Sequence, residues 1–485
     1  MWKRGVSWVV KQEWLIVVLV VVVILRIPSL FEPYWYGDEG IYLTLGQAMR
    51  SGVELYKQIH DNKPPLLYVM AAAAGGNLFW FKLITLLWNL VTIAVFSKLA
   101  KKVFEPGRRK MKLAVWVFAM ATTLPVLEGN IANAELFFLL PTVWAMYWLW
   151  DKNVQMKYII GSGLVLGVAA LFKMPAVLEA GVWPLVWLVE GDKSWWKKTI
   201  ILAIGITAVI GVSGVYFAWK GAGREYLVAA WAQNLPYLST WKAVGGSGIY
   251  AIKGRMVITA LVLTPILGLA RKWGRRATIL GTWGVITLFA ALLSGRPYPH
   301  YLLQSAGVIA IAAAVIIRGS REERVIAWGL SGLTIAAFIG FKFYLYPVAG
   351  YYANFARWVI GTKTRSEYFG WFNPQVNKNY QIAGVVMAGS GEGDKVFVWG
   401  DEPMIYALAK RLPASKYTVE YHIKDFRAQE ETIAALKQNP PKYIVSLANE
   451  AELPGLAELL DGMYRLEKTV DGVRIYRLSR LSLYN

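Results

Sequence analysis

Hydrophobic residues between positions 14 and 344 form long apolar runs, and short polar segments separate them. A helix needs about 20 apolar residues to cross a bilayer, so the pattern predicts a membrane protein with about eleven spans. An odd number of spans places the two ends of the chain on opposite sides of the membrane. The predicted spans are 14–30, 79–99, 112–128, 134–150, 158–172, 174–190, 199–219, 256–271, 277–294, 301–317 and 324–344.

Two apolar segments need a separate interpretation. The run at 14–30 continues into Arg26 and Pro28 without the small residues of a cleavage site, so we expect a retained signal anchor. PLLYVMAAAAGG, residues 65–76, is too short to span the bilayer and predicts a helix that lies at the interface or leads into the second span.

Beyond Pro347 the long apolar runs give way to short segments with strand and helix patterns. Strands are predicted at 394–400, 417–422, 442–447, 464–470 and 473–479, with helices in EPMIYALAKRL, EETIAALKQN and LPGLAELLDG. Asp471-Gly472 predicts a tight hairpin turn between the last two strands. The predicted fold class is therefore a polytopic α-helical membrane protein with a C-terminal extracytoplasmic α/β domain. The membrane domain would cover 1–345, with a first outer loop at 31–78, and the α/β domain would cover 346–485.

Positive charge is concentrated in alternate loops between the predicted spans. The chain has 52 Lys and Arg against 31 Asp and Glu, a formal net charge of +21. The basic residues gather at 108–112, 197–198, 271–276 and 318–324, which is the positive-inside pattern rather than a nucleic-acid-binding surface. We therefore expect a multi-pass plasma-membrane protein with its amino terminus in the cytoplasm and its α/β domain outside. The chain has no cysteine, which excludes disulfides and thiolate metal sites.

Charged side chains in or beside a bilayer are costly without partners, so they indicate function. The predicted topology places several such groups, distant in the chain, at the same outer membrane surface. We expect them to converge in one outward-facing site. The groups are Asp38 and Glu39 after the first span, His60, Asp61 and Lys63 in HDNKPPLLY, Glu128 and Glu135 around GNIANA, Lys173 in ALFKMPA, and Arg296 and His300 in GRPYPHYLL.

Five segments in this order resemble motifs of the GT-C membrane glycosyltransferases, in particular the protein O-mannosyltransferases and lipid A aminoarabinose transferases of glycosyltransferase family 39. The likeness covers most of residues 14–317. The matching segments are DEGIYLTLGQAM (38–49), DNKPPLLY (61–68), NAELFFLLP (133–141), GLVLGVAALFKMP (163–175) and PYPHYLLQSAG (297–307).

Members of this family take a sugar from a polyprenyl phosphate and pass it to an acceptor hydroxyl with inversion at the anomeric carbon. The resemblance thus implies an inverting glycosyltransferase in the lipid bilayer. Its partners would be a polyprenyl-phosphate-linked sugar donor and a hydroxyl-bearing glycan, lipid or protein acceptor. Nucleic acid is not expected as a partner.

The chemistry of this transfer suggests roles for the candidate residues. A departing polyprenyl phosphate needs cations that hold its charge, whereas the attacking hydroxyl needs a carboxylate that accepts its proton. Asp38 is the expected base, and Glu39 or Glu135 would orient the acceptor or the donor sugar. The expected phosphate ligands are Lys63, Lys173, Arg296 and His300, and the expected substrate contacts are His60, Asp61, Tyr68, Tyr298 and Tyr301.

Other interpretations of the pattern remain open. The same charges could line the path of a transporter or lipid flippase, or the spans could be an inert scaffold whose tail binds a partner. No cofactor is expected to be required, although oxygen ligands alone could hold a divalent cation. The segment 220–255, with Trp231, Tyr237 and Trp241, could cover the entrance of a groove for the lipid tail.

Overall fold

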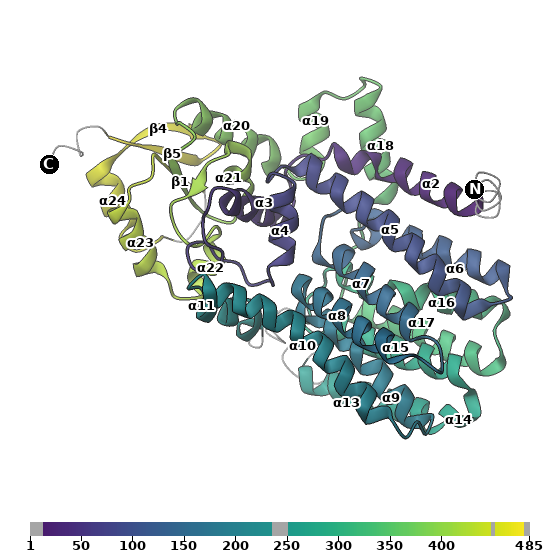
Figure 1. The fold of residues 1–485 in the computed structure, drawn as a ribbon. Coiled ribbons are helices and arrows are strands. Elements are labelled where there is room, and N and C mark those ends of the chain that lie inside the picture. The colour runs from purple at the N-terminus through teal and green to yellow at the C-terminus, as the bar shows by residue number, and fades with distance from the viewer. Residues whose placement is uncertain (1–12, 235–250, 448–451, 480–485) are drawn as a thin grey trace, which may run out of the picture. The chain divides into compact units, whose positions relative to one another are not determined.

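The computed structural model describes residues 13–234, 251–447 and 452–479 (Figure 1). The chain divides into two compact units. The first unit contains Met1–Ile27, Thr85–Tyr216 and Trp231–Val348, and the second contains Pro28–Ile84, Phe217–Ala230 and Ala349–Asn485. The division after Val348 lies close to the predicted boundary at residue 345. The unit with the C-terminal residues also contains the first predicted outer loop.

Helices make up the first unit. Helices α2 (Glu13–Leu30), α5 (Leu78–Phe104) and α10 (Trp195–Trp219), together with the π-helical turn η3 (Val228–Ala232), continue from one unit into the other. The remaining elements of the first unit are α6 (Arg108–Ala121), η1 (Pro125–Leu127), α7 (Ala134–Leu149), α8 (Met156–Phe172), η2 (Met174–Gly181), α9 (Val182–Val189), α13 (Ile252–Gly268), α14 (Ala270–Trp273), α15 (Arg275–Ala291), η6 (Pro299–Ser305), α16 (Ala306–Arg318) and α17 (Arg321–Gly340).

Each predicted span coincides with one of these helices or with two consecutive ones. In the described part of the chain, five helical segments are long and apolar enough to cross a membrane: Glu13–Leu30, Leu78–Phe104, Trp195–Trp219, Pro299–Ile317 and Arg321–Gly340. Proline interrupts several of the shorter predicted spans, because it removes a backbone donor and restricts the preceding residue. The predicted span at 112–128, for example, ends as the α-helix α6 at Ala121 and continues as the short turn η1, which begins with Pro125.

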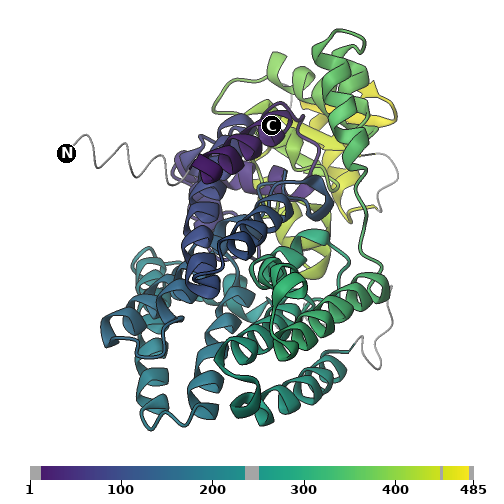
Figure 2. The ribbon, with the colours of Figure 1, turned by 90° about the vertical axis from the view of Figure 1, so that its right-hand side faces the viewer.

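Small residues let neighbouring helices of the first unit approach closely. A Cβ added to Gly163 of α8 would lie 2.4 Å from the carbonyl oxygen of Leu202 in α10. A Cβ added to Gly205 of α10 would lie 2.7 Å from the carbonyl oxygen of Ile160 in α8. Backbone contact through glycine is common where helices pack inside a membrane, because apolar surface alone gives no preference for protein over lipid. Figure 2 shows the blue-to-teal helices of this unit packed side by side.

The second unit combines short helices with one sheet. The elements before the sheet are α3 (Gly37–Arg50), α4 (Leu66–Ala73), α11 (Gly223–Leu227), α18 (Val348–Val359), α19 (Arg365–Gly370) and α20 (Gln375–Ala388). The remaining elements are β1 (Lys395–Trp399), α21 (Met404–Ala409), β2 (Leu412–Pro413), α22 (Glu420–Asp425), α23 (Gln429–Gln438), β3 (Tyr443–Ser446), α24 (Leu456–Met463), β4 (Tyr464–Val470) and β5 (Val473–Leu478).

The described strands form a five-stranded mixed sheet with the order β2-β1-β3-β5-β4. Strand β1 pairs in parallel with β2 and β3, and β5 pairs in antiparallel with β3 and β4. The turn between β4 and β5 has positive φ at both Asp471 (44°) and Gly472 (82°), which confirms the predicted hairpin.

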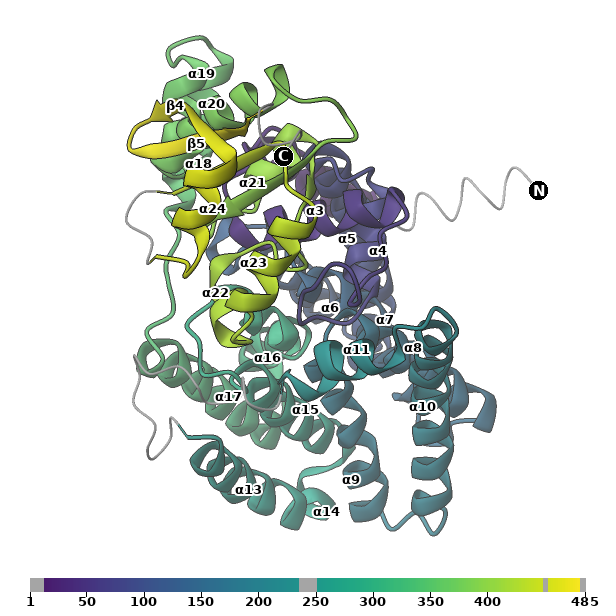
Figure 3. The same ribbon diagram turned by 90° about the vertical axis from the view of Figure 1, so that its left-hand side faces the viewer.

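Helices cover both faces of the sheet because successive strand residues point to opposite sides. Val396 and Val398 of β1 pack with Ile382 of α20 and Ile405 of α21. Phe397 of the same strand packs on the opposite face with residues of α22, α23 and α24, which Figure 3 shows along one side of the strands. The second unit therefore contains a three-layered α/β domain. Together with the apolar helices, this domain confirms the predicted fold class of a polytopic helical membrane protein with a C-terminal α/β domain.

One predicted strand is wrong. Residues 417–422 were expected to form a strand, but Glu420–Asp425 form helix α22. Only Tyr417 of this segment makes a strand-like contact among the described residues, an isolated bridge to His60. The alternation of YTVEYH is not reflected in burial, because Thr418, Glu420 and His422 are buried along with Tyr417 and Val419, whereas Tyr421 is exposed. Helices α18, α19 and α20, which precede the sheet, were not predicted, although Thr364 and Glu367 have the T-x-x-E spacing of a helix start.

Candidate functional site

Asp38 is the second residue of α3 and the more accessible member of the acidic pair. Tyr42, one turn further along the helix, donates a hydrogen bond from its hydroxyl to Asp38 Oδ2 at 2.9 Å. Lys63 Nζ lies 3.5 Å from the same oxygen and 4.9 Å from the centroid of the Tyr42 ring. The Asp38 side chain is 35% exposed. Two neighbours therefore hold this carboxylate in place while leaving part of it open to a substrate.

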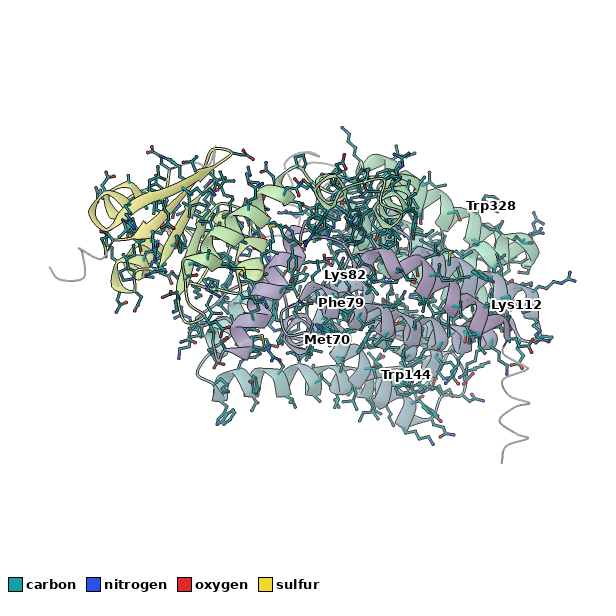
Figure 4. All side chains as sticks on the ribbon, turned by 90° about the horizontal axis from the view of Figure 1, so that it is seen from above. Met70, Phe79, Lys82, Lys112, Trp144 and Trp328 are labelled. Carbon is teal, nitrogen blue, oxygen red and sulfur yellow. The ribbon has the colours of Figure 1, made fainter. Side chains whose placement is uncertain are left out.

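Glu39 is buried among different partners. Its Oε1 lies 2.7 Å from Nζ of Lys82, the residue labelled on α5 in Figure 4, and its side chain is only 3% exposed. Lys82 Nζ also lies 3.1 Å from Glu32 Oε2. Glu32 accepts further hydrogen bonds from the Tyr351 hydroxyl (2.6 Å) and the Trp35 indole (3.0 Å). Consecutive helix residues point about 100° apart, so the two carboxylates of α3 have separate environments.

Asp61 connects the loop between α3 and α4 to the α/β domain. The hydroxyl of Tyr68 donates to Asp61 Oδ2 at 2.7 Å, and Lys63 Nζ lies 3.8 Å from that oxygen. His422 of α22 places Nε2 3.6 Å from Asp61 Oδ1. Lys63 thus lies between two carboxylates, those of Asp38 and Asp61, which restrict where its ammonium can move.

The protonation states in this group follow from burial and charge. Burial raises the pKa of Asp61, but the nearby Lys63 charge and the hydrogen bonds from Tyr68 and the Asn62 amide outweigh it, so the pKa lies below its ordinary value. Burial raises the pKa of Tyr68, which therefore keeps its proton and donates to Asp61. Burial lowers the pKa of His422, which favours the neutral imidazole. The His422 nitrogen that faces Asp61 is Nε2, and its 3.6 Å separation from Oδ1 is longer than a hydrogen bond.

His60 lies within an aromatic cluster of the second unit. Its ring centroid is 4.9 Å from that of Phe426, 5.3 Å from Tyr417 and 5.7 Å from His422. Its backbone amide donates to the carbonyl of Lys416 at 2.9 Å. The side chain of His60, which is predicted to contact substrate, is buried and packs against rings of the α/β domain.

A second group of predicted residues lies in the first unit. Lys173 is the extended residue between α8 and η2, with φ −160° and ψ 127°. Its ammonium binds Glu135, at the start of α7, and lies 4.0 Å from the centroid of the Tyr301 ring in η6. The Lys173 side chain is partly exposed, whereas Glu135 is buried. Three separate elements therefore meet around one accessible cation.

His300 and its neighbours adjoin this group through Tyr301. The His300 ring lies 4.6 Å from the Tyr301 ring and stacks on Tyr298 at 5.7 Å. His300 Nδ1 contacts the buried carboxylate of Glu128, which follows η1 with a left-handed backbone. Arg296 lies in the same segment, and its backbone amide donates to Ser294 Oγ at 3.3 Å.

A buried carboxylate supports the segment that carries Lys173. Glu179 of η2 accepts a hydrogen bond from the Trp283 indole of α15 at 3.0 Å and one from Gln304 of η6 at 3.5 Å. Gln304 also donates to the carbonyl of Pro175 at 3.1 Å. These contacts join η6 to η2, the helical turn that begins immediately after Lys173.

The predicted site residues thus form two groups, each within one unit. Asp38, Lys63, Asp61 and Tyr68 lie together in the second unit, while Glu135, Lys173, Tyr298, His300 and Tyr301 lie together in the first. Trp231 belongs to η3, whereas Tyr237 and Trp241 lie outside the described residues.

Sequence reasoning missed three important partners. Lys82 was counted only as part of a predicted span, although a lysine within an apolar run is itself a signal of a buried ion pair. Glu32 stands immediately after the first span and carried the same signal. Nothing in the local sequence of His422 indicated its contact with Asp61, which lies 361 residues earlier in the chain.

Solved structures with the same fold give an independent comparison. The crystal structure of ArnT from Cupriavidus metallidurans bound to undecaprenyl phosphate has a TM-score of 0.62 and 13% sequence identity, covering 97% of this chain and 99% of that one. The apo structure of the same protein gives a TM-score of 0.61 and 14% identity, covering 96% of this chain and 98% of that one. No family model and no curated protein sequence matches the chain. The likeness establishes the fold, and it confirms the resemblance to GT-C proteins as a structural one.

Proposed function

We propose that this chain is an inverting glycosyltransferase that moves a sugar from a polyprenyl-phosphate-linked donor to an acceptor hydroxyl at the extracytoplasmic face of the membrane. The fold supports the donor class, because the ArnT structure that covers nearly the whole chain holds undecaprenyl phosphate. The side chains support the chemistry. Asp38 is a partly exposed carboxylate paired with Lys63, and Lys173 is a partly exposed lysine paired with Glu135.

The different environments of Asp38 and Glu39 are the observation that carries this proposal. Glu39 is neutralised in a buried ion-pair group, so a substrate cannot reach it without breaking that group. Asp38 keeps an open side and is oriented by Tyr42 and Lys63. A single-displacement reaction needs one carboxylate to take the proton of the acceptor hydroxyl. Asp38 is that base in our proposal, and Glu39 is a structural residue that keeps α3 in place.

The donor phosphate is assigned to the cationic residues. Lys173 is presented by Glu135 and Tyr301, which limit the orientations of its ammonium. Phosphate oxygens are strong acceptors for such a fixed cation, and the interaction grows as negative charge develops on the leaving group. Lys63, Arg296 and His300 are the further phosphate ligands in this proposal. Tyr298 and Tyr301 are the aromatic residues assigned to substrate contact, whereas the fully buried Tyr68 supports Asp61 through its hydroxyl.

The proposed reaction requires no metal ion. A polyprenyl phosphate departs as a stable anion that lysine and arginine can hold. The two adjacent carboxylates that could share a hard cation, Asp38 and Glu39, are instead paired with different lysines. The proposed mechanism accordingly includes no required cofactor.

Replacement of Lys173 with alanine is expected to weaken binding of a polyprenyl-phosphate donor by roughly 10- to 100-fold, because a charge-assisted contact to phosphate is lost. Lys63→Ala is expected to act in the same direction. Lys102→Ala is a matched control, because Lys102 also pairs with a carboxylate (Asp151, 2.5 Å) and lies over a tyrosine ring (Tyr147, 4.3 Å). Isothermal titration of the donor in detergent or nanodiscs measures the affinity of each variant and tests this expectation. Unchanged affinity in both Lys63→Ala and Lys173→Ala would remove these residues from the phosphate site.

The proposed orientation has its own test. The basic loops place the amino terminus in the cytoplasm, and an odd number of spans then places the C-terminal α/β domain outside. An epitope tag after Asn485 is expected to be labelled by an impermeant reagent on intact cells or spheroplasts. A tag that becomes accessible only after permeabilisation would reverse the orientation and with it the face of the reaction.

A further inference from the structure

Helix α3, which carries Asp38, packs closely against α21 of the α/β domain, as Figures 1 and 3 both show. A Cβ added to Gly40 would lie 2.9 Å from the backbone nitrogen of Met404 and 3.2 Å from its Cα. Real Cβ atoms do not approach backbone atoms this closely, so only glycine permits the contact. The contact is two residues from Asp38, within the first turn of α3.

Two further residues on the same face of α3 bind α21 by hydrogen bonds. The Thr44 hydroxyl reaches the carbonyl of Pro403 at 3.1 Å as well as that of Gly40 at 2.8 Å. The Gln47 amide donates to the carbonyls of Ala407 (3.0 Å) and Gly76 (2.9 Å). Ala407 lies in the last turn of α21, where carbonyls have no partner within the helix. Positions 40, 44 and 47 recur at helical spacing, so this face of α3 is matched to the α/β domain.

Through α22, the α/β domain also contacts Asp61, which lies beside Lys63. His422 Nε2 lies 3.6 Å from Asp61 Oδ1, and both side chains are almost fully buried. Asp61 lies 3.8 Å from Lys63, which in turn lies 3.5 Å from Asp38. The bridge between His60 and Tyr417 fixes the backbone beside Asp61 to the same domain. The domain thus contacts both the helix that carries Asp38 and the loop that carries Lys63.

We propose that the α/β domain positions the base, and that Thr44, Gln47 and His422 are positioning residues that act through α3 and Asp61. The proposal rests on the proposed function, because it assigns the domain a task in that reaction. None of the three residues needs to touch a substrate. A misplacement of about 1 Å can reduce catalysis by roughly 100-fold, so these contacts matter even though they lie behind Asp38.

Thr44→Val tests the contact through α3, because it keeps the shape of the side chain and removes the hydroxyl. We expect kcat to fall by about tenfold with little change in KM for the donor. Thr432→Val is the matched control: Thr432 is also buried and also donates to the carbonyl four residues earlier, but its acceptor Ala428 is the N-cap of the same helix, α23. Wild-type kcat in Thr44→Val, or an equal loss in both variants, would overturn this part of the proposal.

A pair of variants tests the contact through α22. His422→Phe keeps a ring beside His60 and Phe426 but removes the ring nitrogen that faces Asp61, whereas His422→Gln keeps an N–H donor. We expect His422→Phe to lower kcat by about tenfold and His422→Gln to restore most of the activity. Equal activity of the two variants would contradict a positioning role for the ring nitrogen.

Hydrogen exchange provides a readout that does not depend on turnover. In His422→Phe, amide exchange is expected to increase at 57–63, and in Thr44→Val at 38–50, while β1 and β3 keep their protection. If the wild type transfers no sugar from polyprenyl-phosphate donors, the proposed function fails whatever the exchange shows. If the wild type is active but the variants match it in both turnover and exchange, only the positioning proposal fails.

Discussion

Asp38→Asn is expected to lower kcat for sugar transfer by roughly 100- to 10,000-fold, because the amide cannot accept the proton of the acceptor hydroxyl. Asparagine keeps the size of the side chain and can still accept a hydrogen bond from Tyr42, which holds the carboxylate at 2.9 Å. Folding and donor binding should therefore be preserved. Single-turnover transfer from a radiolabelled polyprenyl-phosphate sugar, measured alongside donor affinity, separates loss of the base from loss of binding.

Asp151→Asn is a suitable control for this variant. Asp151 also pairs with a lysine, but its side chain is 60% exposed and contributes to no candidate site. Its turnover should match the wild type. Near wild-type turnover in purified Asp38→Asn would show that Asp38 is not the base.

The same assay with EDTA should show unchanged wild-type activity, and a loss that a divalent salt restores would contradict the proposal that no metal is required.

Lys82→Met is expected to reduce the free energy of unfolding by about 3–5 kcal/mol, because it leaves the carboxylates of Glu32 and Glu39 buried without their shared cation. The side chains of Lys82 and Glu32 are fully buried and that of Glu39 is 3% exposed, so solvent cannot replace the lost partner. Methionine fills nearly the same volume, which keeps loss of packing small. Thermal unfolding of the purified protein in detergent should show a large downward shift in the midpoint.

Two further variants identify the cause of such a shift. Lys102→Met removes a lysine from a partly exposed ion pair, and its effect should be at most about 1 kcal/mol. The triple variant Lys82→Met, Glu32→Gln, Glu39→Gln removes the unpaired charges and should recover part of the lost stability. If Lys82→Met unfolds at the wild-type midpoint, the ion-pair group does not stabilise the second unit.

These two expectations assign different tasks to adjacent carboxylates. Replacement of Glu39 should mainly lower the free energy of unfolding, whereas replacement of Asp38 should mainly lower kcat. The division follows from helix geometry, since the two side chains point about 100° apart along α3. The two carboxylates also pair with lysines of different segments: Asp38 with Lys63 in the loop before α4, and Glu39 with Lys82 of α5.

The sequence by itself determined the architecture. Apolar runs of membrane length, alternating basic loops and the change of pattern after Pro347 predicted a helical membrane protein with an α/β domain, because lipid and water impose different periodicities on side chains. Charged residues beside apolar runs also identified Asp38, Lys63, Glu135 and Lys173 as candidates, because an isolated charge is costly there. The pattern failed at 417–422, where buried residues of a turn and a short helix imitate a strand.

Only the tertiary structure decided which partner each charge has. Local sequence does not report contacts between distant segments, such as Glu32 with Tyr351, or Asp61 with His422. It could not show that Glu39 is neutralised while Asp38 stays accessible, since both are acidic and adjacent. Folding determines these pairings because the stability of a buried charge depends on what surrounds it in space, not on its neighbours in the chain.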